Sequence, residues 1–177
     1  MHRPTSIFIG TRAEALQALR TVTKVNTIIC MFGSHAHALC EKEGWAATIL
    51  TAKDRKFSQE IIQSIKENIL LSAGFPWIID EATLSATPTL KLNSHPSLLP
   101  LYPGKNAIKD AFHAGSTNMG VTVHHITPTV DGGPVVASEE TDVRGLSLHE
   151  IYQKMFSIIE PRVIIKSINL INSKSTL

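Results

Sequence analysis

Short apolar runs alternate with amphipathic segments along most of the chain. The apolar runs predict buried strands over residues 5–9, 27–32, 46–50, 69–71 and 89–92. Apolar side chains at helical spacing predict helices over residues 12–22, 36–43, 58–68 and 105–114. A last helical pattern over residues 148–171 is expected to break or kink near Pro161. Because strands alternate with helices, we predict an α/β fold, an open, mostly parallel twisted sheet with helices on both faces.

The region around Asp131 departs from this alternation. Residues 120–126 alternate between polar and apolar side chains, and residues 135–137 continue the pattern beyond a Gly-rich acidic turn. The two runs therefore predict an antiparallel pair of strands. Because no repeat, low-complexity tract or linker interrupts the pattern, we expect a single domain over residues 1–177.

Composition narrows the class of protein. Hydrophobic residues make up 43% and charged residues 18%, an ordinary globular balance. The 17 basic and 15 acidic residues give a net charge of +2, which does not favour a nucleic-acid partner. Two cysteines, Cys30 and Cys40, do not suggest a disulfide framework. Because no apolar run approaches membrane-spanning length and the N-terminus lacks a signal pattern, we expect a cytoplasmic protein without a membrane partner.

Turn-forming or polar residues follow several of the predicted strands. They are Gly10, Gly33, residues 72–74 and Asn93. In an open parallel sheet, ligands bind at the carboxyl ends of the strands. We therefore expect these residues to line one crevice.

The segment from Asn93 to Pro100, NSHPSLLP, carries the strongest chemical signal. Asn93 and His95 are two residues apart, so their side chains share one side of an extended backbone, which Pro96 favours at His95. Asp131 follows in a turn and is able to orient the imidazole and hold it protonated. Each residue alone fits an ordinary strand end or β-turn. Together, an amide, an imidazole and a carboxylate predict acyl transfer to an amine.

Other features give weaker signals. Gly10-Thr11-Arg12 opens a helix and offers N–H groups to a phosphate, although it lacks a GxGxxG motif, and a solvated first-turn arginine is the commoner role for Arg12. His124-His125 predicts one buried, hydrogen-bonded histidine and one exposed histidine. Phe75-Pro76-Trp77 fits either the wall of a flat ligand's site or an ordinary core or loop segment. No spacing matches a metal-ligand pattern, so we predict no metal.

Three motifs together resemble the folate-dependent formyltransferase family. They are NSHPSLLPLYPG from Asn93, GVTVHH from Gly120 and VDGGPVV from Val130. The resemblance implies the open α/β fold and an enzyme that gives the formyl group of 10-formyltetrahydrofolate, a co-substrate, to an amine. The motifs look most like the phosphoribosylglycinamide formyltransferase branch, which formylates glycinamide ribonucleotide in purine synthesis.

The resemblance also implies roles for individual residues. Asn93, His95 and Asp131 match the family's catalytic trio, in which Asn93 and a protonated His95 would donate hydrogen bonds to an oxyanion. The folate would contact Phe75, Trp77, Ile78, Ile79, Val130, Gly132 and Gly133. The acceptor would lie against Gly10, Thr11 and Arg12. The expected partners are therefore a small-molecule amine and a folate, and a homodimer is left open.

Two departures from the purine branch concern the acceptor. The first loop resembles the opening of the methionyl-tRNA branch, and Ser157-Ile158 stands near the place of a Glu-His pair in the last helix. Three alternatives therefore stay open. The acceptor is an amino sugar on a nucleotide carrier, or the acceptor is water and the enzyme a 10-formyltetrahydrofolate hydrolase, or the chain binds folate without turnover.

Overall fold

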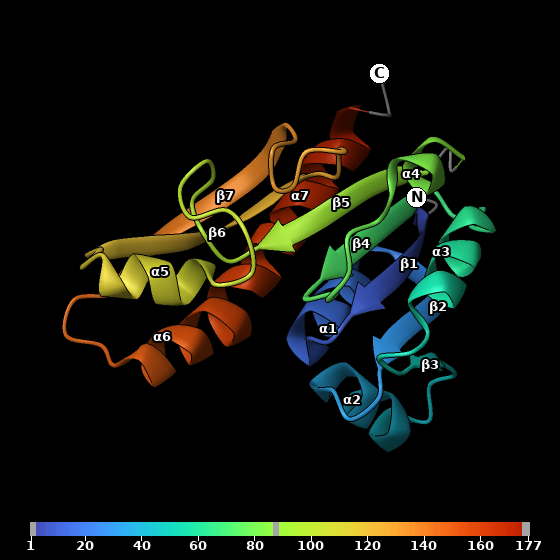
Figure 1. Ribbon diagram of the computed structural model, residues 1–177, viewed down its shortest axis with the longest axis horizontal. Coiled ribbons are helices and arrows are strands. Elements are labelled where there is room, and N and C mark those ends of the chain that lie inside the picture. Colours follow the sequence, from blue (N-terminus) through green and yellow to red (C-terminus); the bar gives the residue numbers. More distant parts are fainter. Residues whose placement is uncertain (1–2, 87–88, 175–177) are drawn as a thin grey trace.

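The computed structural model describes residues 3–86 and 89–174, which build a seven-stranded sheet (Figure 1). The strand order is β3-β2-β1-β4-β5-β6-β7. Strands β1 to β5 pair in parallel, whereas β6 is antiparallel to both β5 and β7. The predicted fold class and the predicted antiparallel pair are confirmed. The strands are β1 (Thr5–Gly10), β2 (Lys24–Met31), β3 (Thr48–Leu50), β4 (Ile69–Ala73), β5 (Leu90–His95), β6 (Asn118–His125) and β7 (Val135–Asp142).

Helices cover both faces of the sheet. The alternation in β1 sends Phe8 to one face and Ile7 and Ile9 to the other, and each side chain joins a separate apolar cluster. The Phe8 face is covered by α1, α2, α5, α6 and α7, and the opposite face by α3 and α4. The helices are α1 (Ala13–Val22), α2 (His35–Glu43), α3 (Arg55–Gln63), α4 (Glu81–Ala86), α5 (Ala107–His113), α6 (Leu148–Lys154) and α7 (Glu160–Lys174). Within the described residues, none of these helices is long and apolar enough to cross a membrane.

Local signals fix several helix ends. The Ser34 side chain accepts a hydrogen bond from the N–H of His37 at the start of α2, and Gly44 ends that helix in the left-handed conformation. A capping box between Ser147 and Glu150 starts α6. These signals are polar and close in sequence, and they act together with the apolar spacing from which the helices were predicted.

The segment before β4 was predicted wrongly. We expected a helix over residues 58–68, but α3 ends at Gln63. The reason is tertiary, because the N–H of Asn68 donates to the carbonyl of Thr5 and the Asn68 side chain accepts from Thr5.

Helix α4 was missed, although Asp80 accepts a hydrogen bond from the N–H of Thr83 in the manner of an N-cap.

The expected break near Pro161 is a π-helical segment, Met155–Ile159, between α6 and α7. Proline has no N–H, and its ring clashes with the carbonyl four residues earlier in a regular α-helix. The N–H of Glu160 instead donates to the carbonyl of Met155, five residues back. The wider turn keeps the helix continuous and sets which side chains face the sheet.

Gly10 ends β1 at a close approach to β4. A Cβ at this position would lie 2.1 Å from the carbonyl oxygen of Ala73, and φ is +157°. Gly10→Ala should therefore lower the free energy of unfolding by at least about 2 kcal/mol, measured by urea denaturation. Gly33→Ala is the matched control, because its φ of +73° is unfavourable but its Cβ would meet nothing within 4 Å. The control should lose only about 1 kcal/mol. Equal losses would contradict the account of the close approach.

Candidate active site

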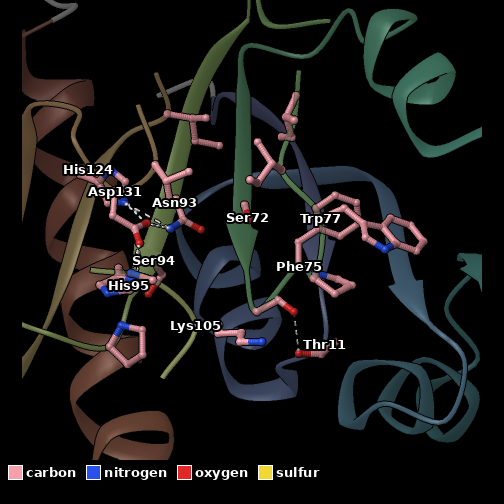
Figure 2. A pocket seen from close by; sticks show the side chains of 18 of the residues that line it. Thr11, Ser72, Phe75, Trp77, Asn93, Ser94, His95, Lys105, His124 and Asp131 are labelled. Carbon is pink, nitrogen blue, oxygen red and sulfur yellow. Dashed lines mark hydrogen bonds and ion pairs between the residues drawn. The ribbon is translucent and has the colours of Figure 1, made fainter. Parts of the chain in front are cut away.

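A cavity of about 630 Å³ lies at the carboxyl ends of β1, β4 and β5 (Figure 2). The strand order reverses between β1 and β4, where ligands of open α/β sheets bind. The predicted crevice is therefore present. Ser72, Gly74 and Asn93 line it as expected, whereas Gly10 and Gly33 are not among its lining residues.

Strand β5 brings Asn93 and His95 to the cavity. The strand continues through His95 rather than stopping at Leu92, so both side chains point to one face, as predicted. The antiparallel register with β6 places His124 directly opposite Asn93. Opposed residues of an antiparallel pair share a face, and His124 therefore joins the two predicted residues.

Asp131 reaches the same place from the loop between β6 and β7, with a φ of +51° that Asp tolerates better than most residues. Its Oδ2 accepts a hydrogen bond from the N–H of Gly104 at 2.7 Å and lies 3.4 Å from Nδ1 of His95. Its Oδ1 lies 3.5 Å from both Nδ2 of Asn93 and Nε2 of His124. The sequence-predicted trio thus meets within one cavity.

The Asp131 carboxyl is ionised at neutral pH. Burial acts to raise its pKa, but the contact with His124, the hydrogen bond from the Gly104 N–H and the proximity of His95 outweigh burial and leave the pKa below its ordinary value. The site therefore contains a fixed negative charge next to His95.

Opposing effects act on the protonation of His95. Burial lowers its pKa, the proximity of His124 and the charge of Arg12 lower it further, and the Tyr102 carbonyl and Asp131 offset only part of the effect. Burial thus opposes the protonated ring that we expected, whereas the oxygen acceptors at both ring nitrogens, the Tyr102 carbonyl and Asp131, favour it, and the expectation stays a prediction. Nε2 lies 2.9 Å from the carbonyl oxygen of Tyr102 and must carry the proton of the neutral ring. Nδ1, facing Asp131, is left as a proton acceptor.

His124 is a site residue that the sequence reasoning missed. It is buried and hydrogen-bonded, as one of the two adjacent histidines was predicted to be, whereas His125 is half-buried rather than exposed. Nδ1 of His124 lies 2.9 Å from the carbonyl of His125, so the neutral ring has its proton there and accepts through Nε2. Nδ2 of Asn93 lies 3.2 Å from that Nε2, and Figure 2 shows the Asn93 amide nitrogen turned toward His124 and Asp131. The pairing register of β5 with β6 would have identified His124 as a site residue. That register is known only once the order of the strands in the sheet is known.

Apolar side chains form one wall of the cavity. Phe75 and Trp77 are in edge contact with ring centroids 5.3 Å apart, and the predicted folate contacts Ile78, Ile79 and Val130 line the same cavity. Gly132 and Gly133 are not among its lining residues. A Cβ on Gly133 would lie 1.9 Å from the carbonyl oxygen of His125, so this glycine allows a close backbone approach.

In the first loop, Gly10-Thr11-Arg12, many of the hydrogen-bonding groups are already bonded to other groups of the protein. The N–H of Thr11 donates to the carbonyl of Ala73, and the Thr11 hydroxyl donates to the carbonyl of Gly74. Arg12 is only 12% exposed and pairs with Glu160, with Nη1 2.8 Å from Oε1. The ordinary expectation of a solvated Arg12 is therefore wrong, although Thr11 and Arg12 both line the cavity.

Comparison with known proteins identifies the family of the chain. The family model described as "Formyl transferase" matches residues 20–168. The chain belongs to the formyl transferase family. The resemblance inferred from the three motifs is thereby confirmed.

Two curated members of the formyl transferase family illustrate the extent of the match. Phosphoribosylglycinamide formyltransferase of Escherichia coli is 31% identical over 153 residues, which cover 77% of this chain and 72% of that protein. The enzyme of the same name from Bacillus subtilis is 34% identical over 90 residues, 49% of this chain and 46% of that protein. The chain thus spans less than half of the Bacillus relative.

A solved structure has the same fold. Glycinamide ribonucleotide transformylase 1 of Geobacillus kaustophilus superposes with a TM-score of 0.83 at 26% identity, over 96% of this chain and 99% of that chain. The open α/β sheet described above is therefore the fold of this solved relative.

The lowered pKa of Asp131 predicts a pH-dependent contribution to stability. A carboxyl whose pKa falls on folding stabilises the folded state above its unfolded pKa of about 3.9, and the contribution is lost as pH falls through the folded value. Asp131→Asn should therefore lower the free energy of unfolding at pH 7, and the difference from wild type should narrow below about pH 4. The exposed Asp110→Asn is the control. A difference that stays constant or widens in acid would contradict the assignment.

Proposed function

We propose that this chain transfers the formyl group of 10-formyltetrahydrofolate to the amine of glycinamide ribonucleotide. One observation carries the proposal: an amide, an imidazole and an ionised carboxylate meet in one cavity of a formyl transferase family member. Relatives named for this reaction support the choice of acceptor. The cavity's size suits small-molecule substrates.

The apolar wall supports the folate half of the proposal. Small-molecule sites are mostly apolar, with a few polar groups that fix orientation. Phe75, Trp77 and Ile79 offer such a surface next to the polar groups of β5. The aromatic side chains of this wall fit the flat ring of a pterin. A pterin bound there would leave the formyl group near Asn93.

Asn93 is the proposed oxyanion donor. Attack of the neutral amine forms a C–N bond and moves the carbonyl electron pair onto oxygen. Nδ2 of Asn93 has two hydrogens, and His124 accepts from this nitrogen at 3.2 Å. The contact with Asp131 is longer, 3.5 Å, so the second hydrogen is available to the developing oxyanion. His124 would hold the amide in this orientation before the reaction begins.

His95 is the proposed proton carrier. The attacking amine becomes positively charged and must lose a proton, which Nδ1 of the neutral ring accepts directly or through a water. Asp131, 3.4 Å from Nδ1, stabilises the imidazolium so formed. The same proton then passes to the folate nitrogen as its bond to the formyl carbon breaks. The formyl amide and tetrahydrofolate leave, and the ring is neutral again.

The acceptor is proposed to enter beside Thr11 and Arg12. These two residues line the cavity at the end of β1, and Figure 2 shows Thr11 on the same side of the cavity as Phe75 and Trp77. The amine would then reach the formyl carbon from the end of β1.

The choice of acceptor is tested by measuring the loss of 10-formyltetrahydrofolate in the presence of purified protein and each candidate acceptor. We expect turnover with glycinamide ribonucleotide and little without an amine. Turnover with a nucleotide-linked amino sugar instead would replace the acceptor, and turnover with water alone would mean a hydrolase. Folate binding without any turnover would contradict the enzymatic proposal.

Asn93→Ala tests the oxyanion role. Loss of one such donor should lower kcat about 10²–10³-fold, measured under saturating substrates. Asn106→Ala is a suitable control, because this asparagine is exposed and its side chain does not cap α5. Near-normal turnover of Asn93→Ala would remove Asn93 from the mechanism. His95→Ala should be at least as damaging, because it removes the proton acceptor.

A further inference from the structure

Arg12 connects the cavity to the opposite face of the sheet. Its backbone starts α1, and its Nη2 donates to the carbonyl of Ser94 at 3.3 Å. Ser94 stands between Asn93 and His95 in β5, and its side chain points away from theirs. Arg12 thus holds the peptide that joins the two proposed catalytic residues.

Glu160 meets Arg12 on that opposite face. Its side chain is fully buried, and Oε1 lies 2.8 Å from Nη1 of Arg12 and accepts a hydrogen bond from the Ser94 hydroxyl at 2.5 Å. A single carboxylate therefore contacts both the arginine and the catalytic strand. Arg12, Ser94 and Glu160 form a closed triangle that we call the Arg12 bridge.

The π-helical segment supplies the rest of this arrangement. It precedes Glu160 and Pro161 directly and also contains Phe156, whose ring centroid lies 4.6 Å from Cζ of Arg12. Phe156 lines the cavity, whereas Glu160 is buried beneath the sheet. The Arg12 guanidinium thus contacts the Phe156 ring on one side and the Glu160 carboxylate at its end.

Stability alone accounts poorly for this pair. The cost of burying two charges offsets most of their attraction, so buried ion pairs often add little net stability. Within the described residues, Nε and Nη1 of Arg12 and Oε2 of Glu160 have no hydrogen-bond partner, since the 2.8 Å contact between Nη1 and Glu160 is an ion pair without hydrogen-bond geometry, and this raises that cost. What the pair does provide is a fixed position for the Ser94 peptide.

We propose that Arg12 is a positioning residue, which with Glu160 and Ser94 holds the Asn93–His95 segment in its reactive geometry and places a positive charge beside His95. The proposal rests on the proposed formyl transfer for its kinetic readout. It adds a second role to a residue expected only to contact the acceptor, because the charge of Arg12 is already paired.

Few charged or titratable groups take part in the electrostatic half of the proposal, the effect of the Arg12 charge on His95. Asp131, His124 and Arg12 are the charged or titratable groups that act on His95, together with the Tyr102 carbonyl. Burial, the largest cause, raises the pKa of Glu160, and the charge of Arg12 and the hydrogen bond from Ser94 oppose that rise, whereas Glu14 adds to it. Arg12 is a permanent cation among the groups that act on His95, so its removal should make the His95 ring easier to protonate.

Three variants separate charge from geometry. Arg12→Met removes the charge and keeps much of the length, Arg12→Lys keeps the charge without the planar fork, and Glu160→Gln keeps the shape and removes the carboxylate. Ser6→Ala is the matched control, because it removes a buried hydrogen bond to Thr23 from the same strand, β1, far from the cavity. Each protein is studied by NMR titration of the His95 ring, by steady-state kinetics and by thermal unfolding.

The Arg12 bridge predicts a distinct result for each variant. Arg12→Met should raise the titration midpoint of His95, whereas Arg12→Lys and Glu160→Gln should not raise it. All three should lower kcat about tenfold or more with KM for the folate substrate little changed, because a displaced reacting group is costly. Ser6→Ala should lower only the unfolding temperature.

A purely structural role would give the opposite pattern. The three variants would then lose stability as Ser6→Ala does, and neither the His95 midpoint nor kcat of the folded protein would change, which would overturn the proposal. Because the NMR titration needs no turnover, an unchanged midpoint in Arg12→Met counts against the bridge even if the proposed acceptor is wrong. Absence of turnover in the wild type would count against the proposed function alone.

Discussion

The change from parallel to antiparallel pairing between β5 and β6 is the constraint on which the site depends. β5 is the last strand of the parallel part of the sheet, and β6 runs back along it with His124 opposite Asn93. This reversal lets the loop after β6 fold over the carboxyl end of β5. Asp131 therefore reaches His95 through one short loop, and the backbone pairing of β5 with β6 sets where the site residues lie.

The loop after β5 makes the site rigid. Ser97 donates to the carbonyl of Leu101, and the hydroxyl of Thr122 in β6 donates to the carbonyl of Ser97. The same loop presents the Tyr102 carbonyl to His95 and the Gly104 N–H to Asp131. Backbone groups of one loop thus orient both ionisable groups, so little reorganisation is needed when charge develops.

The sequence allowed the fold class and the predicted trio to be placed, because both depend on local signals. Asn93 and His95 are related by the two-residue period of a strand, and Pro96 restricts the backbone after them. The role of His124 depends on register across two strands, and that of Arg12 on a glutamate near the other end of the chain. The protonation of His95 depends on burial, which a linear pattern does not contain. Gly132 and Gly133 belong to a matching motif, yet they serve chain packing beside the cavity.

The most direct measurement follows the formyl carbon itself. Protein is mixed with 10-formyltetrahydrofolate labelled with ¹³C at the formyl group and with glycinamide ribonucleotide, and the label is followed by NMR. The account predicts that the label moves into an amide of the acceptor at a rate that depends on Asp131. Label appearing as free formate, or staying on the folate while the folate is bound, would contradict it.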